Sequence, residues 1–295
     1  VMVDFHEYKP YRVDFVNFGD YGTTSMFDCM FLYSGNLNVC PRIKQTIEEV
    51  YLPSAKQQLD KYGLKYHNYL SSKHKNNKVY FNLGSVSPRS SATSFALGNS
   101  ISMLMEVRGV GLNKNSFKRR VFTTYLLANS FLETSLKESS LVKQEIKNCN
   151  SFPNEIVVKY QKEKSNYQLD MIDVYKNEVI PVDILLYNGL KCNSEVTRQR
   201  PKYYIIESDL SVVVDKLKVL GLDVDTLIYD ELLQVESFHI ISEQKSPELF
   251  QGFHENIVST NLINQEKLFK KGTFIVPMDQ KRSNIAVETL EPEML

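Results

Sequence analysis

Two short segments, about a hundred residues apart, each end in a side chain that can do chemistry. The first, residues 1–8, is an apolar run that reaches His6, and the second, residues 101–109, is an apolar run that reaches Glu106. A neutral imidazole is a good zinc ligand, and a carboxylate can act as a general base beside a metal. If both runs are strands of one sheet, the sequence predicts a metal-hydrolase site at one edge of that sheet. A structural histidine is the alternative for His6.

Glu106 is the more informative of the two residues. The run from Ile101 to Val107 is apolar except for Ser102 and Glu106, which is typical of a strand buried on both faces. A carboxylate in such a place is costly unless it is paired, protonated or near a metal. Arg108 lies two residues on and therefore on the same face. Both interpretations stay open, a local ion pair with Arg108 and cooperation of the two side chains at a site.

Composition excludes several classes of partner. The chain has 295 residues, 42% hydrophobic and 24% charged, with a formal net charge of zero. This balance favours neither nucleic acid nor an anionic membrane as a partner. No apolar run approaches the roughly 18 residues that span a bilayer. The chain begins inside the first strand, so the lack of a signal peptide carries no information on secretion.

The first half of the chain is predicted to be α/β. An aromatic-rich irregular stretch, residues 9–38, is expected to line or cover a site. A helix is expected over residues 41–62, kinked or divided at Pro53, and another over residues 116–135. A strand followed by a helix at the end of a domain fits a mixed-sheet α/β/α sandwich.

The second half has a different residue pattern, in which strand-like runs occur at residues 155–160, 169–175 and 182–187. A strand–helix–strand unit is expected over residues 203–229, further strands at 236–242 and 273–276, and a last helix at 283–290. We predict two domains, residues 1–147 and a β-rich α/β domain of residues 148–295. The four cysteines form no CxxC pair. Cys29 and Cys40 either bridge in an oxidising compartment or are two buried free thiols.

The residues around both candidate side chains resemble one family. His6-Glu7-Tyr8 and the segment from Glu106 to Gly111 are similar to the zinc metallocarboxypeptidases, the carboxypeptidase A-like family, over about residues 1–137. The segments Asp4-Phe5-His6 and Arg119-Arg120-Val121 favour its bacterial branch. The resemblance implies that His6 is the third zinc ligand and Glu106 the general base. It also implies substrate-binding roles for Tyr8, Arg108, Arg89 and Tyr80, with a peptide as substrate.

The resemblance also shows what this sequence lacks. The family takes its first two zinc ligands from an upstream His-x-x-Glu motif, and none of the five histidines here has Glu at the third following position. Zinc is therefore expected only if these ligands are supplied by the missing N-terminal half of the catalytic domain, which is a possible partner. Passages at residues 200–206 and 272–278 resemble an accessory domain behind the catalytic domain of bacterial members. By this analogy the protein is periplasmic or extracellular.

Three functions follow as hypotheses. The first is a zinc-dependent metallocarboxypeptidase-like hydrolase that cleaves peptide bonds with a zinc-activated water and Glu106 as the base. The second is a deacylase-type amidohydrolase of small N-acyl substrates. The third, from another class, is a non-catalytic relative that binds peptide or glycan and has lost the metal.

Overall fold

The computed structural model describes residues 1–75, 78–150, 153–250 and 252–294. The chain divides into two compact units, residues 1–151 with 161–193, and residues 152–160 with 194–295. The predicted boundary after residue 147 lies close to the first crossing between the units. The return of residues 161–193 to the first unit was not foreseen. It arises because long strands in this part of the chain pair with strands of the first unit.

The first unit is built around a four-stranded mixed sheet in the order β1-β7-β3-β4. Its strands are β1 (Met2–Tyr8), β7 (Ser102–Arg108), β3 (Cys29–Leu32) and β4 (Tyr66–Asn68). β1 runs parallel to β7, which is antiparallel to β3, and β3 runs parallel to β4. As the sequence predicts, β7 is a central strand, with its first four residues fully buried. This strand order brings the two candidate segments side by side.

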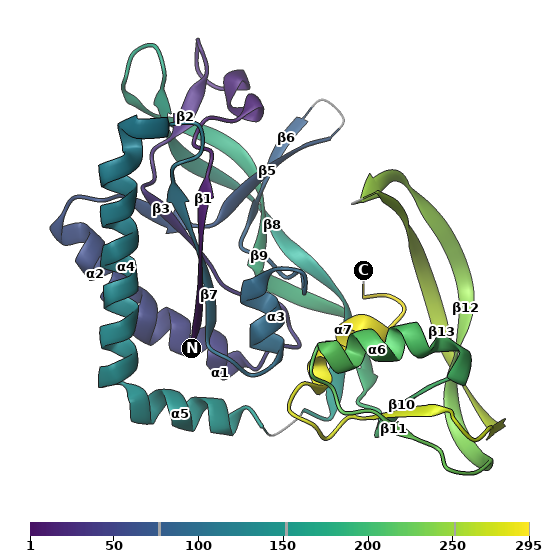
Figure 1. The fold of residues 1–295 in the computed structure, drawn as a ribbon. Coiled ribbons are helices and arrows are strands. Elements are labelled where there is room, and N and C mark those ends of the chain that lie inside the picture. Colours follow the sequence, from purple (N-terminus) through teal and green to yellow (C-terminus); the bar gives the residue numbers. More distant parts are fainter. Residues whose placement is uncertain (76–77, 151–152, 251, 295) are drawn as a thin grey trace. The chain divides into compact units, whose positions relative to one another are not determined.

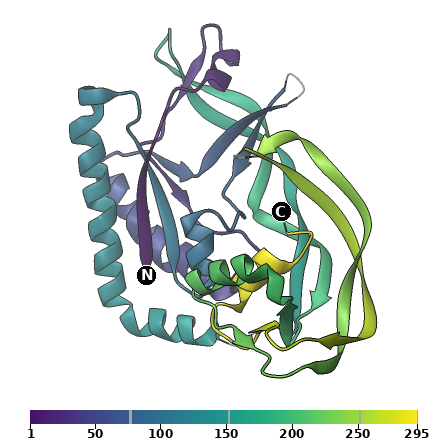
Figure 2. The same ribbon diagram turned by 45° about the vertical axis from the view of Figure 1, so that its right-hand side comes forward.

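Helices cover both faces of this sheet. α4 (Phe117–Lys137) packs on β7 and on α2 (Leu52–Lys61). α3 (Ser91–Leu97) packs on β7 and β1, where Ala92 meets Leu32 and Leu104. In both views α4 and α2 lie on one side of the sheet and α3 on the other (Figures 1 and 2). The α/β class predicted from the sequence is confirmed.

The helix predicted over residues 41–62 is present with an irregular middle turn. It consists of α1 (Pro41–Thr46), a π-helical turn (Ile47–Tyr51) and α2. Pro53 has no N–H to bond the carbonyl of residue 49, so the hydrogen-bond ladder must shift at this point. Two further helices lie outside the ranges expected from the sequence. The serine-rich segment after Pro88 forms α3, and a further helix, α5 (Ser139–Asn148), follows α4.

A second sheet of the first unit has the order β2-β8-β9-β6-β5. It contains β2 (Thr23–Ser25), β8 (Glu155–Asp173), β9 (Val179–Gln199), β6 (Lys78–Leu83) and β5 (Leu70–Lys75). The pairing of β8 with β2 and of β9 with β6 holds residues 161–193 in this unit. The predicted irregular stretch of residues 9–38 therefore contains two strands, β2 and β3.

The second unit holds a three-stranded sheet, β10-β14-β11, and a two-stranded ribbon, β12-β13. The sheet is formed by β10 (Tyr203–Ile206), β14 (Phe274–Pro277) and β11 (Asp225–Thr226), and the ribbon by β12 (Glu231–Phe250) and β13 (Phe253–Phe269). Its helices are α6 (Ser211–Val219) and α7 (Ser283–Leu290), and the α7 bounds match the prediction. The strand expected at residues 224–229 is only two residues long.

The cysteine pairing differs from both expectations. Cys40 forms a disulfide with Cys149, with Cα atoms 5.7 Å apart, while Cys29 is buried as a free thiol in β3. Cys29 pairs with Val107 and Tyr66 inside the sheet, whereas Cys40 directly precedes α1 and Cys149 directly follows α5, which packs on α1. Among the described residues, no helix combines the length and the hydropathy that a bilayer crossing requires.

Candidate active site

His6 and Glu106 lie opposite one another. The parallel register of β1 and β7 pairs Met2 with Ser102 and His6 with Glu106. Because side chains alternate along a strand, Asp4, His6 and Glu106 share the face on which α3 packs. The expectation that two distant strands bring an imidazole and a carboxylate together therefore agrees with the geometry.

Asp4 was not singled out from the sequence, and it orients His6. Its Oδ2 accepts a hydrogen bond from Nε2 of His6 at 3.1 Å and one from the Ser91 hydroxyl at 2.7 Å. A carboxylate only accepts, so Nε2 carries the proton and the lone pair of the neutral ring lies on Nδ1. The His6 side chain is 50% exposed, so Nδ1 belongs to an accessible ring. The spacing of Asp4 and His6, two residues apart on one strand, was the available sequence signal.

Glu106 sits in a half-buried environment that disfavours its charge. Burial raises the pKa of this carboxyl above its usual value, and nearby Asp4 acts in the same direction, while His6 and Arg12 act against it. Arg108 donates instead to the carbonyl of Ser25, and no ion pair joins it to Glu106 within the described part of the chain. The local ion-pair interpretation of Glu106 is therefore wrong.

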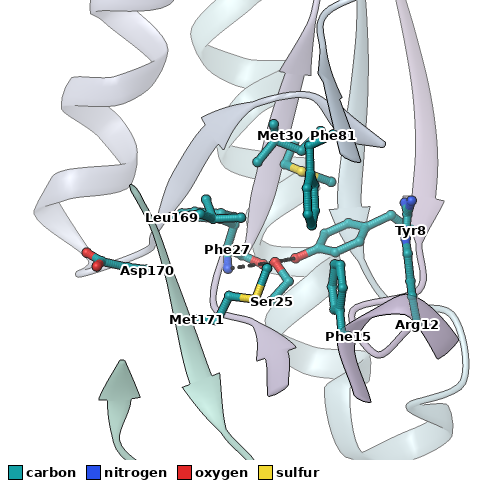
Figure 3. Close-up of a pocket in the computed structure, with 11 residues that line it drawn as sticks. Tyr8, Arg12, Phe15, Ser25, Phe27, Met30, Phe81, Leu169, Asp170 and Met171 are labelled. Carbon is teal, nitrogen blue, oxygen red and sulfur yellow. Dashed lines mark hydrogen bonds between the residues drawn. The ribbon is translucent and has the colours of Figure 1, made fainter. Parts of the chain in front are cut away.

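Tyr8 lies two residues beyond His6 and is buried. Its hydroxyl donates to the carbonyl of Phe27 and lies 3.0 Å from the Ser25 hydroxyl, and burial raises its pKa to about 12. The ring of Tyr8 forms part of the wall of a small pocket with a free volume of about 20 Å³. Figure 3 shows its hydroxyl pointing toward Ser25 inside this pocket.

The pocket adjoins the row that contains Glu106. Met30, which pairs with Glu106 across β3 and β7, lines it together with Arg12. The other lining residues are mostly apolar, and they are Phe15, Phe27, Leu70, Phe81, Leu169 and Met171, with Ser25 and Asp170 (Figure 3). The lining is mainly apolar with a few polar groups, and the space it encloses has room for about one water molecule.

Tyr80 and Arg89, the other two residues predicted to bind substrate, lie in different parts of the first unit. Tyr80 lies on β6 of the second sheet, with its ring 5.4 Å from that of Tyr187. The tyrosine that lies near Glu106 is Tyr69, whose pKa is raised by burial and then by the charge of Glu106. Arg89 is exposed in the turn before α3, two residues ahead of Ser91, which bonds Asp4.

The donor set for a metal is incomplete in this chain. Within the described residues, no group of three or more His, Cys, Asp or Glu side chains could hold a metal ion. A catalytic zinc takes three protein ligands. His6 therefore fits one ligand position, and the other two are not provided by the described residues.

The chain is similar to the protein named carboxypeptidase 2 of Trichophyton rubrum, at 22% identity over 271 residues, which cover 90% of this chain and 50% of that protein. It is similar to the probable carboxypeptidase 2 of Trichophyton verrucosum (strain HKI 0517), also at 22% identity, over 91% of this chain and 53% of that protein. The chain is also similar to carboxypeptidase 2 of Trichophyton equinum, at 22% identity over 90% of this chain and 50% of that protein.

The chain thus spans about half the length of the relatives it matches. No family model matches the chain, and no solved structure matches it. These relatives are fungal, so they do not bear out the bacterial branch suggested by the sequence, which stays a prediction.

Proposed function

We propose that this chain forms part of a zinc-dependent, metallocarboxypeptidase-like hydrolase that cleaves peptide bonds. The observation that carries the proposal is the register of β1 and β7, which sets His6 against Glu106. The names of the distant relatives support the same class of enzyme. The complete enzyme would include two further zinc ligands outside this chain, in the His-x-x-Glu arrangement of the family.

His6 would provide one zinc ligand through Nδ1. The bond from Nε2 to Asp4 fixes the ring orientation and raises the basicity of the free nitrogen, as carboxylates do for many metal-bound histidines. When bound, zinc would polarise the scissile carbonyl and lower the pKa of a water molecule. In this proposal the exposed ring of His6 is the group through which this chain would bind zinc.

Glu106 would be the general base. A carboxyl whose pKa is raised by burial takes a proton and gives it up more readily near neutral pH than an ordinary glutamate. Glu106 would accept a proton from water and deliver it to the departing amine. Arg12, which lines the adjoining pocket and lies near Glu106, helps to hold the ionised form before the reaction.

The apolar side chains that line the small pocket beside Glu106 would form an apolar surface next to the bound peptide. Tyr8 contributes its ring to this wall, because its hydroxyl is already bonded to Phe27 and Ser25. Tyr69 is a better candidate than Tyr80 for a tyrosine that meets the substrate, since Glu106 acts on its pKa. Arg89, in the turn beside Ser91, would meet a carboxylate of the substrate.

The disulfide supports a location outside the cytoplasm, in the periplasm or the extracellular medium. Disulfides persist in oxidising compartments and are rare in the cytosol. Cys40 and Cys149 are joined across 109 residues of sequence, so this bond is a structural one within the first unit.

The test is the replacement Glu106→Gln in the full-length protein. The variant should lose peptide hydrolysis while its zinc content stays at the wild-type level, and near-normal turnover would contradict the role of Glu106. The substrate screen should compare peptides with N-acyl amino acids, and activity on the latter alone would favour the deacylase.

A second candidate is a binding protein that has lost the metal. It is favoured by the incomplete donor set among the described residues. Full-length protein without zinc after incubation with excess zinc at neutral pH would select this candidate over the enzyme.

A further inference from the structure

A second pocket, of about 310 Å³, lies where β7 ends and α4 begins. It is separate from the apolar pocket and shares no lining residue with it. Three arginines line it. Its polar lining residues are Arg108, Arg119, Arg120, Asp28, Asn115, Ser116 and Thr123.

The charges in this pocket do not balance. Asp28 is the one carboxylate among the lining residues, and it is 4% exposed. Its Oδ2 accepts a bond from Nη2 of Arg119 at 2.9 Å and one from the backbone N–H of Lys65 at 2.7 Å. Asp28 therefore offsets Arg119 and leaves the other two guanidinium groups uncompensated within the pocket.

The positive charges of the other two arginines, Arg120 and Arg108, are less fully balanced by acidic partners. Arg120 lies 3.3 Å, from Nε to Oε1, from the partly exposed Glu7. Arg108 donates to the neutral carbonyl of Ser25, and it makes no ion pair with an acid in the described ranges. Each guanidinium has five N–H groups, so both retain donors that can bind an incoming anion.

Ser116 is a further polar residue of the pocket wall. It is 9% exposed, and its buried Oγ has no hydrogen-bond partner within the described structure. Buried hydroxyls nearly always have one. Ser116 precedes α4, and its side chain does not cap that helix.

The sequence at the start of α4 is unfavourable without an anion. Lys118, Arg119 and Arg120 occupy its first turn, where the helix dipole disfavours positive charge. An anion in the adjacent pocket would reverse this effect.

We propose that this pocket binds a small tetrahedral oxyanion of the phosphate class. Guanidinium groups pair with such oxyanions through two parallel bonds, and the amide of Asn115 adds a neutral donor. The site does not include His6 or Glu106, and it does not depend on the function proposed above.

The test is calorimetric titration of inorganic phosphate into the full-length protein, with ionic strength held constant by chloride. One saturable site is expected. Asn115→Asp adds a negative charge at an exposed position near the start of α4, where acids favour the helix, so the variant should fold and bind phosphate at least about tenfold more weakly. The matched control is Asn256→Asp, an exposed position opposite Lys245 on the β12-β13 ribbon, which should bind like wild type.

A second variant tests that the buried hydroxyl takes no part in binding. Ser116→Ala should keep both its thermal midpoint in chloride and its phosphate affinity, because the Oγ of Ser116 has no partner within the described structure and almost no surface open to the pocket. Absence of saturable binding, or equal affinities in the two Asn→Asp variants, would overturn the proposal. Saturation by glutarate but not by phosphate would overturn the assignment to tetrahedral oxyanions.

Discussion

His6 and Glu106 are direct partners in the register of two parallel strands, although a hundred positions separate them in the sequence. One side chain is accessible and the other is half-buried, because β1 lies at the edge of the four-stranded sheet and β7 lies inside it. An exposed imidazole beside a carboxyl of raised pKa is an arrangement that supplies a metal ligand and a base from adjacent positions.

The raised pKa of Glu106 predicts how stability depends on pH. The unfolded chain ionises at the usual glutamate value, near pH 4, whereas the folded chain resists ionisation. The free energy of unfolding therefore falls as the pH rises from the pKa of the unfolded chain through the pKa of the folded chain. Below the unfolded-state pKa the carboxyl is protonated in both states, and Glu106 causes no loss of stability. Glu106→Gln removes this loss of stability, because glutamine does not ionise. The thermal midpoint of the variant should therefore exceed that of wild type by an amount that grows as the pH rises from about 4 to neutral.

Thermal scans at a series of pH values check this prediction. Glu243→Gln is the control, because this exposed glutamate loses the same charge without burial. A difference between Glu106→Gln and wild type that stays constant across the series, or that declines toward neutral pH, would contradict the burial argument.

Asp4 should matter for metal affinity if the proposed function is correct. Asp4→Asn keeps the shape of the side chain but removes the charge that holds the proton on Nε2 of His6. Loss of such a partner typically weakens metal binding by about 10–100-fold. Competition with a zinc indicator in the full-length protein measures the change. Ser91→Ala removes the other bond to Asp4 and should have a smaller effect, and equal losses in both variants would argue against the orienting role.

Much of the first sheet was accessible from the sequence because its signals are local. The continuous apolar run before Glu106 predicted a central strand, and a last helix was expected over residues 283–290, where α7 lies. The strand β3 was missed because all four of its residues are buried, so it shows no alternation within an aromatic-rich stretch. Burial on both faces leaves a four-residue strand indistinguishable from a packed loop.

The remaining features depend on contacts distant in the sequence. The pairing of Cys40 with Cys149 rather than Cys29 follows from the contact of α1 with α5, which no spacing rule encodes. Tyr69 lies near Glu106, whereas Tyr80 lies on a strand of the other sheet, and both precede the Glu106 strand. A tyrosine in this interval was expected at the site, but only the fold distinguishes the two.

The disulfide should contribute measurable stability to the first unit. A bond that closes a loop of this length restricts the unfolded chain and typically stabilises by about 2–4 kcal/mol. Denaturant unfolding with and without a reductant should therefore show a lower midpoint in the reductant. The double variant Cys40→Ser, Cys149→Ser should be insensitive to the reductant, and Cys29 and Cys192 should titrate as the two free thiols of the unfolded oxidised protein. Four titratable thiols without reductant would contradict the pairing.

The second unit contains a buried ionic cluster centred on Arg198. Its guanidinium contacts Glu291 and also Glu293, the latter through two bonds of 2.8 Å, and all three side chains are at most 9% exposed. The Tyr204 hydroxyl donates to Glu291, and the Thr260 hydroxyl donates to Glu293. Arg198 is thus the cation shared by both carboxylates of the cluster.

Removing that cation should be severely destabilising. Arg198→Met leaves two buried carboxylates without their partner, and breaking a buried pair in this way costs about 3–5 kcal/mol. The triple variant Arg198→Met, Glu291→Gln, Glu293→Gln removes the stranded charges and should recover most of the lost stability, since neutral replacement of a whole buried cluster is often tolerated. Denaturant unfolding followed in the second unit measures both. A triple variant that is less stable than Arg198→Met alone would mean that the glutamates stabilise the fold through bonds independent of Arg198.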